Sequence, residues 1–228
     1  MVPDPEAQKK VWVELLGAET AHAGSLELLR LPGIFIVVGK SRASAVEGSE
    51  GSTVPHFGFA VKSYPEMKAK VASAGLVVVT DTPRNKQLIV EFPDKIRVEL
   101  TEVASIQVPV AMHHIHLATP DPEALRGWYV KTFGAEPAVR ANFLAAKIPG
   151  GEVDTRKADT AQAPTKGRAL DHIGFEVKNL EQFCKNLQAH GVVLESPYRE
   201  MPQLGGLKIA FLTDPEGTRI ELTEGLPK

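Results

Sequence analysis

Cysteine is almost absent from this sequence, which has one among 228 residues. A single thiol excludes a disulfide framework and a cysteine-rich zinc site within one chain. No apolar run reaches 18 residues, so no membrane-spanning helix is expected. The N-terminus, MVPDPEAQKK, shows no cationic stretch followed by an apolar one. Without such a secretory signal, the expected location is cytoplasmic.

Charge of one sign is not concentrated anywhere in the chain. Lys and Arg number 26 and Asp and Glu 28, the formal net charge is −2, and no long basic run is visible. We therefore expect no nucleic-acid partner. Hydrophobic residues make up 43% of the chain, enough to close a core without covalent staples. The expected partner is a small-molecule substrate, and no membrane is expected.

The sequence repeats itself. Three blocks of the first half recur in the same order in the second half, two of them at offsets of 117 and 116 residues. Three matched blocks in order indicate a tandem duplication. The matched blocks are 4–21 with 121–138, 56–75 with 172–191, and 93–102 with 215–224.

Each half also contains a shorter repeat of secondary-structure elements. In the second half a strand, HHIHLA, precedes a helix that Asp121 caps and Gly134 ends, and strand-like segments follow. The order then restarts at DHIGFEV, so the pattern predicts four βαβββ units. We assign them to two α+β domains, residues 1–106 and 107–228.

The first unit lacks its opening strand. At the offset of 117, the counterpart of His114 would fall before residue 1. A missing strand leaves unpaired N–H and C=O groups along a sheet edge. We expect either upstream residues or another segment to cover that edge. An export signal on upstream residues would reverse the cytoplasmic expectation.

The two-residue period of a strand assigns side chains to faces. His114 and His116 share one face of their strand, opposite Ile115 and Leu117. The same alternation places His172, Glu221 and Asp154 on the open faces of theirs. Two imidazoles and a carboxylate form the facial set for a divalent metal with open positions.

These motifs resemble the vicinal oxygen chelate superfamily, which includes glyoxalase I, extradiol dioxygenases and bleomycin-binding proteins. The resemblance covers nearly the whole chain, and the DPEG…IEL ending carries it most specifically. It implies paired βαβββ units that form cup-shaped mixed sheets. It also implies one divalent metal ion (Fe, Mn, Ni or Zn), held by His114, His172 and Glu221. A homodimer is among the assemblies that it allows.

The N-terminal half departs from the family pattern. His56 and Glu99 occupy the second and third ligand positions, whereas the first would lie on the missing strand. The segment Ile34–Lys40, IFIVVGK, is apolar on both faces. We therefore expect the N-terminal half to be structural and the C-terminal half to hold the site.

The resemblance also implies two catalytic candidates. His116 is a base or a substrate contact, against the alternative of a spacer that lines the cup. Glu152 and Asp154 lie where glyoxalase I carries its fourth ligand and its catalytic carboxylate, and Asp154 matches better. Either of them can also be a plain exposed acid.

The leading function is that of a metal-dependent lyase or isomerase of the glyoxalase type. An extradiol-type dioxygenase is the first alternative, although the tyrosine position of that class reads Phe211. The second alternative is a metal-free protein that binds an antibiotic or another small molecule. The polar lining expected for the cup favours a metal site over such an apolar clamp.

Overall fold

The computed structural model describes residues 1–227. It contains four helices, α1 (Pro5–Leu16), α2 (Tyr64–Ser73), α3 (Pro122–Phe133) and α4 (Leu180–Ala189), and three 3-10 turns, η1 (Pro83–Asn85), η2 (Pro93–Lys95) and η3 (Pro202–Leu204), among the described residues. The strands of the first half are β1 (Glu19–Ala23), β2 (Leu26–Leu31), β3 (Ile34–Ile36), β4 (His56–Val61), β5 (Val77–Thr82), β6 (Gln87–Phe92) and β7 (Ile96–Glu102). Those of the second half are β8 (Val110–Thr119), β9 (Glu136–Arg140), β10 (Phe143–Ile148), β11 (Gly151–Lys157), β12 (Ile173–Glu176), β13 (Leu194–Met201), β14 (Leu207–Thr213) and β15 (Arg219–Glu224).

The repeated helices α1 and α3 begin and end in the same way. Asp4 accepts hydrogen bonds from two backbone N–H groups of the first turn of α1, and Asp121 accepts one in α3. A proline follows each cap, where its missing N–H costs nothing. Gly17 and Gly134 end the helices with φ values of 76° and 67°, a left-handed conformation that glycine adopts without strain. The sequence-based prediction that Asp121 caps a helix and Gly134 ends it is confirmed for α3.

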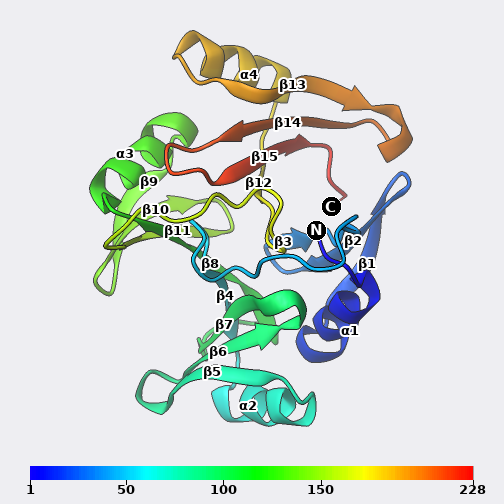
Figure 1. Cartoon of the computed structure of the whole chain (residues 1–228), viewed down its shortest axis with the longest axis vertical. Coiled ribbons are helices and arrows are strands. Elements are labelled where there is room, and N and C mark those ends of the chain that lie inside the picture. The colour runs from blue at the N-terminus through cyan, green and yellow to red at the C-terminus, as the bar shows by residue number, and fades with distance from the viewer. Residues whose placement is uncertain (228) are drawn as a thin grey trace.

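The largest sheet joins the two halves of the chain. Its eight strands follow the order β5-β6-β7-β4-β8-β11-β10-β9, with β4 antiparallel to β8 at its centre (Figure 1). The second unit therefore pairs with the third. Helix α2 packs against β6 and β7, and α3 packs against β10 and β11.

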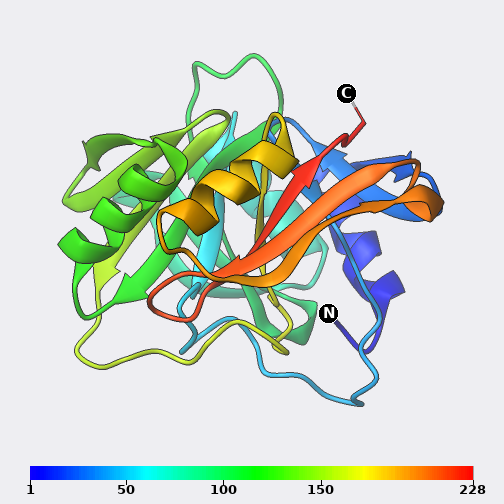
Figure 2. The same ribbon diagram turned by 90° about the horizontal axis from the view of Figure 1, so that it is seen from above.

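The first and fourth units form two smaller sheets. The order is β1-β2-β3 in one and β12-β15-β14-β13 in the other, with α4 packed against the latter. The two sheets lie side by side near the ends of the chain (Figures 1 and 2). Leu26 of β2 packs beside Leu207, Ile209 and Phe211 of β14. Among the described residues no strand bridges β3 and β12.

The mixed α+β architecture of four βαβββ-type units is confirmed, including the missing first strand. One apolar core cluster runs through all four units and includes Trp12, Phe59, Tyr129 and Leu212. The domain boundary between residues 106 and 107 stays a prediction, and the eight-stranded sheet takes strands from both sides of it. No helix in residues 1–227 combines the length and apolar character needed to span a membrane.

Candidate metal centre

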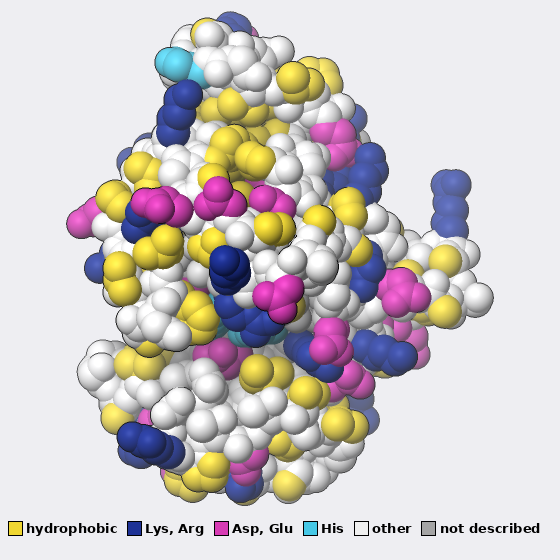
Figure 3. All heavy atoms as spheres, turned by 60° about the vertical axis from the view of Figure 1, so that its left-hand side comes forward, with side chains coloured by type: hydrophobic (Ala, Val, Ile, Leu, Met, Phe, Trp, Pro, Cys, Tyr) yellow, Lys and Arg dark blue, Asp and Glu magenta, His cyan; other side chains and the backbone are white. Residues whose placement is uncertain are grey.

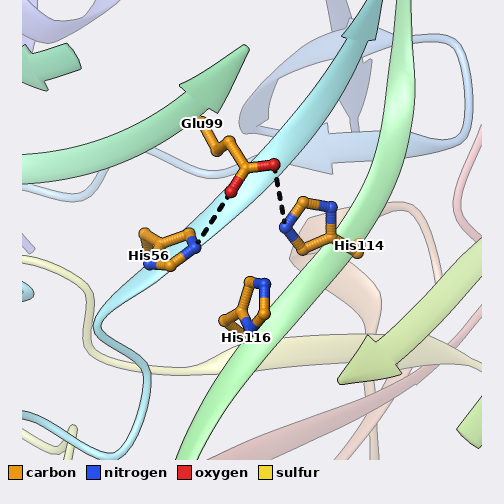
Figure 4. Close-up of side chains that lie close together, drawn as sticks. All are labelled: His56, Glu99, His114 and His116. Carbon is orange, nitrogen blue, oxygen red and sulfur yellow. Dashed lines mark ion pairs between the residues drawn. The ribbon is translucent and has the colours of Figure 1, made fainter. Parts of the chain in front are cut away.

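Four side chains with metal-binding atoms converge at the centre of the eight-stranded sheet. They are His56 at the start of β4, Glu99 on β7, and His114 and His116 on β8 (Figure 4). All four are buried, and one potential ligand atom from each lies within 4.8 Å of the others.

The register of the strands creates this cluster. Gly58 of β4 pairs with Glu99 on one side and with His114 on the other. His56, two residues earlier on the same face, pairs with His116. A Cβ atom on Gly58 would lie 2.8 Å from both ring nitrogens of His114, so this position needs glycine.

The imidazoles of His56 and His114 both face the Glu99 carboxylate. Nε2 of His56 lies 3.3 Å from Oε2, and Nε2 of His114 lies 3.6 Å from Oε1. Neither Nε2 atom makes a hydrogen bond. Nδ1 of His114 is 2.8 Å from Nδ1 of His113, a contact that fixes the ring with Nε2 toward the cluster.

Burial sets the protonation states of these groups. It lowers the pKa of His114 to about 2 and, together with the nearby His56, that of His116 to about 3. Burial acts to raise the pKa of Glu99, but His56 and His114 outweigh it and hold that pKa below its ordinary value. At neutral pH His114 and His116 are therefore neutral imidazoles and Glu99 is an ionised carboxylate, the forms that bind metal.

Asp154 lies beside the cluster on β11, paired with His116 of β8. Burial raises the pKa of Asp154 to about 6, against the lowering effect of Arg140. Arg140 Nε donates to Asp154 Oδ2 at 2.6 Å and also lies 2.9 Å from Glu152 Oε1. Oδ1 of Asp154 is buried and has no hydrogen-bond partner. His116 Nε2 is 3.8 Å from Asp154 Oδ2.

The structure does not assemble the predicted triad of His114, His172 and Glu221. His172 precedes β12 and Glu221 lies on β15, both in the four-stranded sheet, whereas His114 lies in the eight-stranded one. The reason is the pairing of units: β8 pairs with β4 of the second unit, not with β12 of the fourth. The expectation that the N-terminal half is structural stays a prediction, although His56 and Glu99 of that half lie in the cluster around His114.

His172 and Glu221 instead form a hydrogen-bonded pair of their own. Nε2 of His172 is 3.1 Å from Glu221 Oε2, and its Nδ1 is 2.8 Å from Asp171 Oδ1. Burial acts to lower the pKa of His172, but these two carboxylates overcome it and raise the pKa to about 8. Arg219 Nη1 donates to Asp171 at 2.7 Å. Both ring nitrogens thus make hydrogen bonds, whereas Nε2 of His56 and Nε2 of His114 approach Glu99 without one.

The residues of the eight-stranded sheet fit a divalent metal ion. Three imidazoles and a carboxylate are ligands that such ions prefer, and buried nitrogens without partners are rare in folded proteins. Nε2 of His56, Nε2 of His114 and Nδ1 of His116 are three such atoms. Figure 3 shows histidine atoms at the bottom of a hollow in the surface, with Lys or Arg side chains at its rim.

Two features of this site carry no signal in the sequence alone. Arg140 lies at the end of β9, and no local motif marks it as a partner of Asp154. His113 is on the face of β8 opposite to His114, so the period of the strand assigns it away from the site. Its ring contact with His114 depends on side-chain conformation, which the strand period does not specify.

Both the sequence and the fold of this chain resemble those of known proteins. A sequence model of the "Glyoxalase/Bleomycin resistance protein/Dioxygenase superfamily" matches residues 111–222. No curated protein sequence matches the chain. Glyoxalase I from Zea mays shares the fold with a TM-score of 0.75 at 15% identity, over 98% of this chain and 89% of that one. A putative dioxygenase from Bacillus subtilis gives a TM-score of 0.72 at 15% identity, over 99% and 83%. Residues 111–222 thus belong to the glyoxalase/bleomycin resistance protein/dioxygenase superfamily, the vicinal oxygen chelate superfamily that the repeats resemble, and the whole chain shares the fold of glyoxalase I.

Proposed function

We propose that His56, Glu99 and His114 hold one divalent metal ion, with His116 as the nearest further ligand. The observation that carries this proposal is the set of unpartnered, buried imidazole nitrogens that surround one carboxylate. A buried polar atom without a partner costs roughly 1–3 kcal/mol, and a bound cation would remove that cost for three atoms at once.

We propose a lyase or isomerase of the glyoxalase type as the activity. The bound ion would supply stabilisation of negative charge on a substrate that presents two adjacent oxygens. Asp154 is the base that removes a proton from the carbon next to a carbonyl group. Its pKa of about 6 suits that task near neutral pH, and its Oδ1 is free to accept the proton.

The neighbouring residues position this base. Arg140 holds Oδ2 of Asp154, which leaves Oδ1 as the atom available to substrate. An isomerisation consumes no second reactant, because the proton taken from one carbon is returned to its neighbour. His116 is buried next to this base, with its Nε2 atom 3.8 Å from Asp154 Oδ2.

A dioxygenase is the second candidate. Two histidines and one carboxylate, here His56, His114 and Glu99, form the ligand set of non-haem iron oxygenases. His116 beside that set is a neutral imidazole, which can hydrogen-bond to substrate. Iron as the native metal would favour this chemistry, whereas nickel or zinc would favour isomerisation.

Elemental analysis of the purified protein tests the metal site. We expect near-stoichiometric metal in the wild type and a loss of about tenfold or more in H114A and E99Q. H172A and E221Q are matched controls, because they alter the equivalent His and Glu in the other sheet. Loss of metal in these controls instead would restore the triad that the sequence predicts. A wild type that takes up no added metal would leave a metal-free binding protein.

The base is tested separately from the metal. With the thiol hemiacetal of glutathione and an α-ketoaldehyde as the assayed substrate, D154N should retain its metal and lose about 10²–10⁴-fold in kcat. Unchanged turnover in D154N at full metal occupancy would remove Asp154 from the mechanism.

A further inference from the structure

Strand β8 contains a β-bulge next to the candidate metal centre. The pairing of β8 with β4 passes from His114 directly to Met112, so His113 is one extra residue on β8. The pairing of β8 with β11 begins at His114 and also leaves His113 without a partner. A bulge bends its strand and redirects a side chain. It therefore accounts for the contact between the rings of His113 and His114, which an evenly alternating strand would point apart.

A turn of the first sheet holds this bulge in place. Met112 N donates a hydrogen bond of 2.8 Å to the carbonyl oxygen of Pro32, in the turn between β2 and β3. A Cβ atom on Gly33 of the same turn would lie 3.0 Å from Cβ of Met112, so the turn lies directly against β8. The backbone that precedes His113 is thus fixed by a contact outside its own sheet, which keeps the two rings together.

One hydrogen lies between the two rings. Nδ1 of His113 is 2.8 Å from Nδ1 of His114, so one of these nitrogens carries the hydrogen and the other accepts it. A neutral imidazole has a single N–H. The hydrogen bond between the rings therefore also decides whether Nε2 of His114 carries a hydrogen or a lone pair.

The surroundings of this Nε2 atom favour opposite arrangements with and without metal. Nε2 of His114 lies 3.6 Å from Glu99 Oε1, and an ionised carboxylate attracts an N–H more than a lone pair (Figure 4). Without metal, the hydrogen is therefore favoured on Nε2, and His113 donates to Nδ1 of His114. A metal ion binds the lone pair of Nε2, so the hydrogen of His114 must then be on Nδ1 and His113 must accept it.

We propose that His113 is a positioning residue whose tautomer reverses when the metal centre is filled. Its Nδ1 donates to His114 in the empty site and accepts from His114 in the filled one. The hydrogen between the rings moves to Nδ1 of His114, and the one displaced from Nε2 of His114 passes to water. Water returns a proton to Nε2 of the half-buried His113 ring, so the charge of the pair does not change. This inference rests on the proposed metal site.

NMR of ¹⁵N-labelled histidine tests the reversal on the full chain, first stripped of metal and then with an equimolar amount of Zn²⁺. His113 should change from the Nδ1–H to the Nε2–H tautomer, and His114 should change in the opposite direction. The signals are assigned from single histidine variants. The same tautomer of His113 in both spectra would overturn the proposal.

Variants at His113 test the same role through Zn²⁺ affinity, measured by isothermal titration. H113A removes the partner of His114 and should weaken binding by about 10–100-fold. H113N retains an acceptor and a donor near the place of Nδ1 and should keep most of the affinity. H113Q carries the same amide one methylene further out and should lose affinity as H113A does.

The outcomes separate this role from the metal site itself. A wild type that binds Zn²⁺ no better than H113A does would overturn the role of His113 alone. A wild type that takes up no Zn²⁺ at all would overturn the proposed metal site, and the reversal with it.

Discussion

One glycine permits the convergence of histidine and carboxylate in the eight-stranded sheet. Gly58 lies beneath the His114 ring. Gly174 is its counterpart beside His172, and a Cβ atom added there would lie 3.7 Å from its nearest neighbour, the backbone oxygen of Glu221. Because close packing leaves no room for an added methyl group, only the first position should be sensitive.

We expect G58A to displace the His114 ring and to weaken metal binding by about tenfold or more. G174A should bind metal as the wild type does. Isothermal titration with Zn²⁺ on protein stripped of metal measures both. Equal affinities in G58A and the wild type would contradict the placement of His114 as a ligand.

His172 should make stability depend on pH above neutrality. Its pKa of about 8 in the folded protein exceeds the ordinary 6.5, so folding favours the protonated form. This stabilisation is complete below about pH 6.5 and is lost as pH rises through about 8. It amounts to at most about 2 kcal/mol.

Urea unfolding between pH 6 and pH 9 measures this effect, with H172Q as the reference. The stability advantage of the wild type should shrink across that range. An advantage that does not change with pH would show that Asp171 and Glu221 do not hold a charged imidazole.

At the scale of elements, the helices follow from local sequence alone. Asp121, Pro122 and Gly134 mark both ends of α3, and the same three residue types mark α1. Such caps act over a few residues, so no distant contact is needed to recognise them.

Removal of the α3 cap should destabilise the protein measurably. Asp121 accepts a hydrogen bond from Ala124 N at 3.0 Å, so D121A should cost about 1 kcal/mol and lower Tm by about 2–4 °C. D121N, which keeps a capping oxygen, is the control. A thermal melt that does not distinguish the two variants would contradict the cap.

At the scale of the whole molecule, the candidate metal centre lies between the halves. His56 and Glu99 come from one side of the predicted boundary at residues 106 and 107, and His114 comes from the other. The antiparallel pairing of β4 with β8 brings them together. The halves should therefore depend on one another both for metal binding and for stability.

Separate expression of residues 1–106 and 107–228 tests this dependence. Neither fragment alone should bind metal with the affinity of the full chain, and mixing them should restore both binding and the metal-dependent rise in Tm. Metal bound stoichiometrically by fragment 107–228 alone would show that the C-terminal half contains a site of its own.

Much of this molecule is determined by the sequence itself. The duplicated blocks establish four units, the caps establish the helices, and the period of β8 places His114 and His116 opposite Ile115 and Leu117. Both apolar residues are indeed in the core. These features are local, so short windows of sequence contain the information that specifies them.

The composition of the site is decided only by the tertiary structure. His56 and His172 begin the same repeated block, and Glu99 and Glu221 lie in the same closing motif, so the sequence offers His114 two equivalent sets of partners. Strand pairing between units selects the set of the second unit. Seven residues, 103–109, connect β7 to β8, and β8 pairs with β4, the neighbour of β7, while β12 lies in another sheet. Such pairing depends on contacts between distant segments, and no local pattern specifies them.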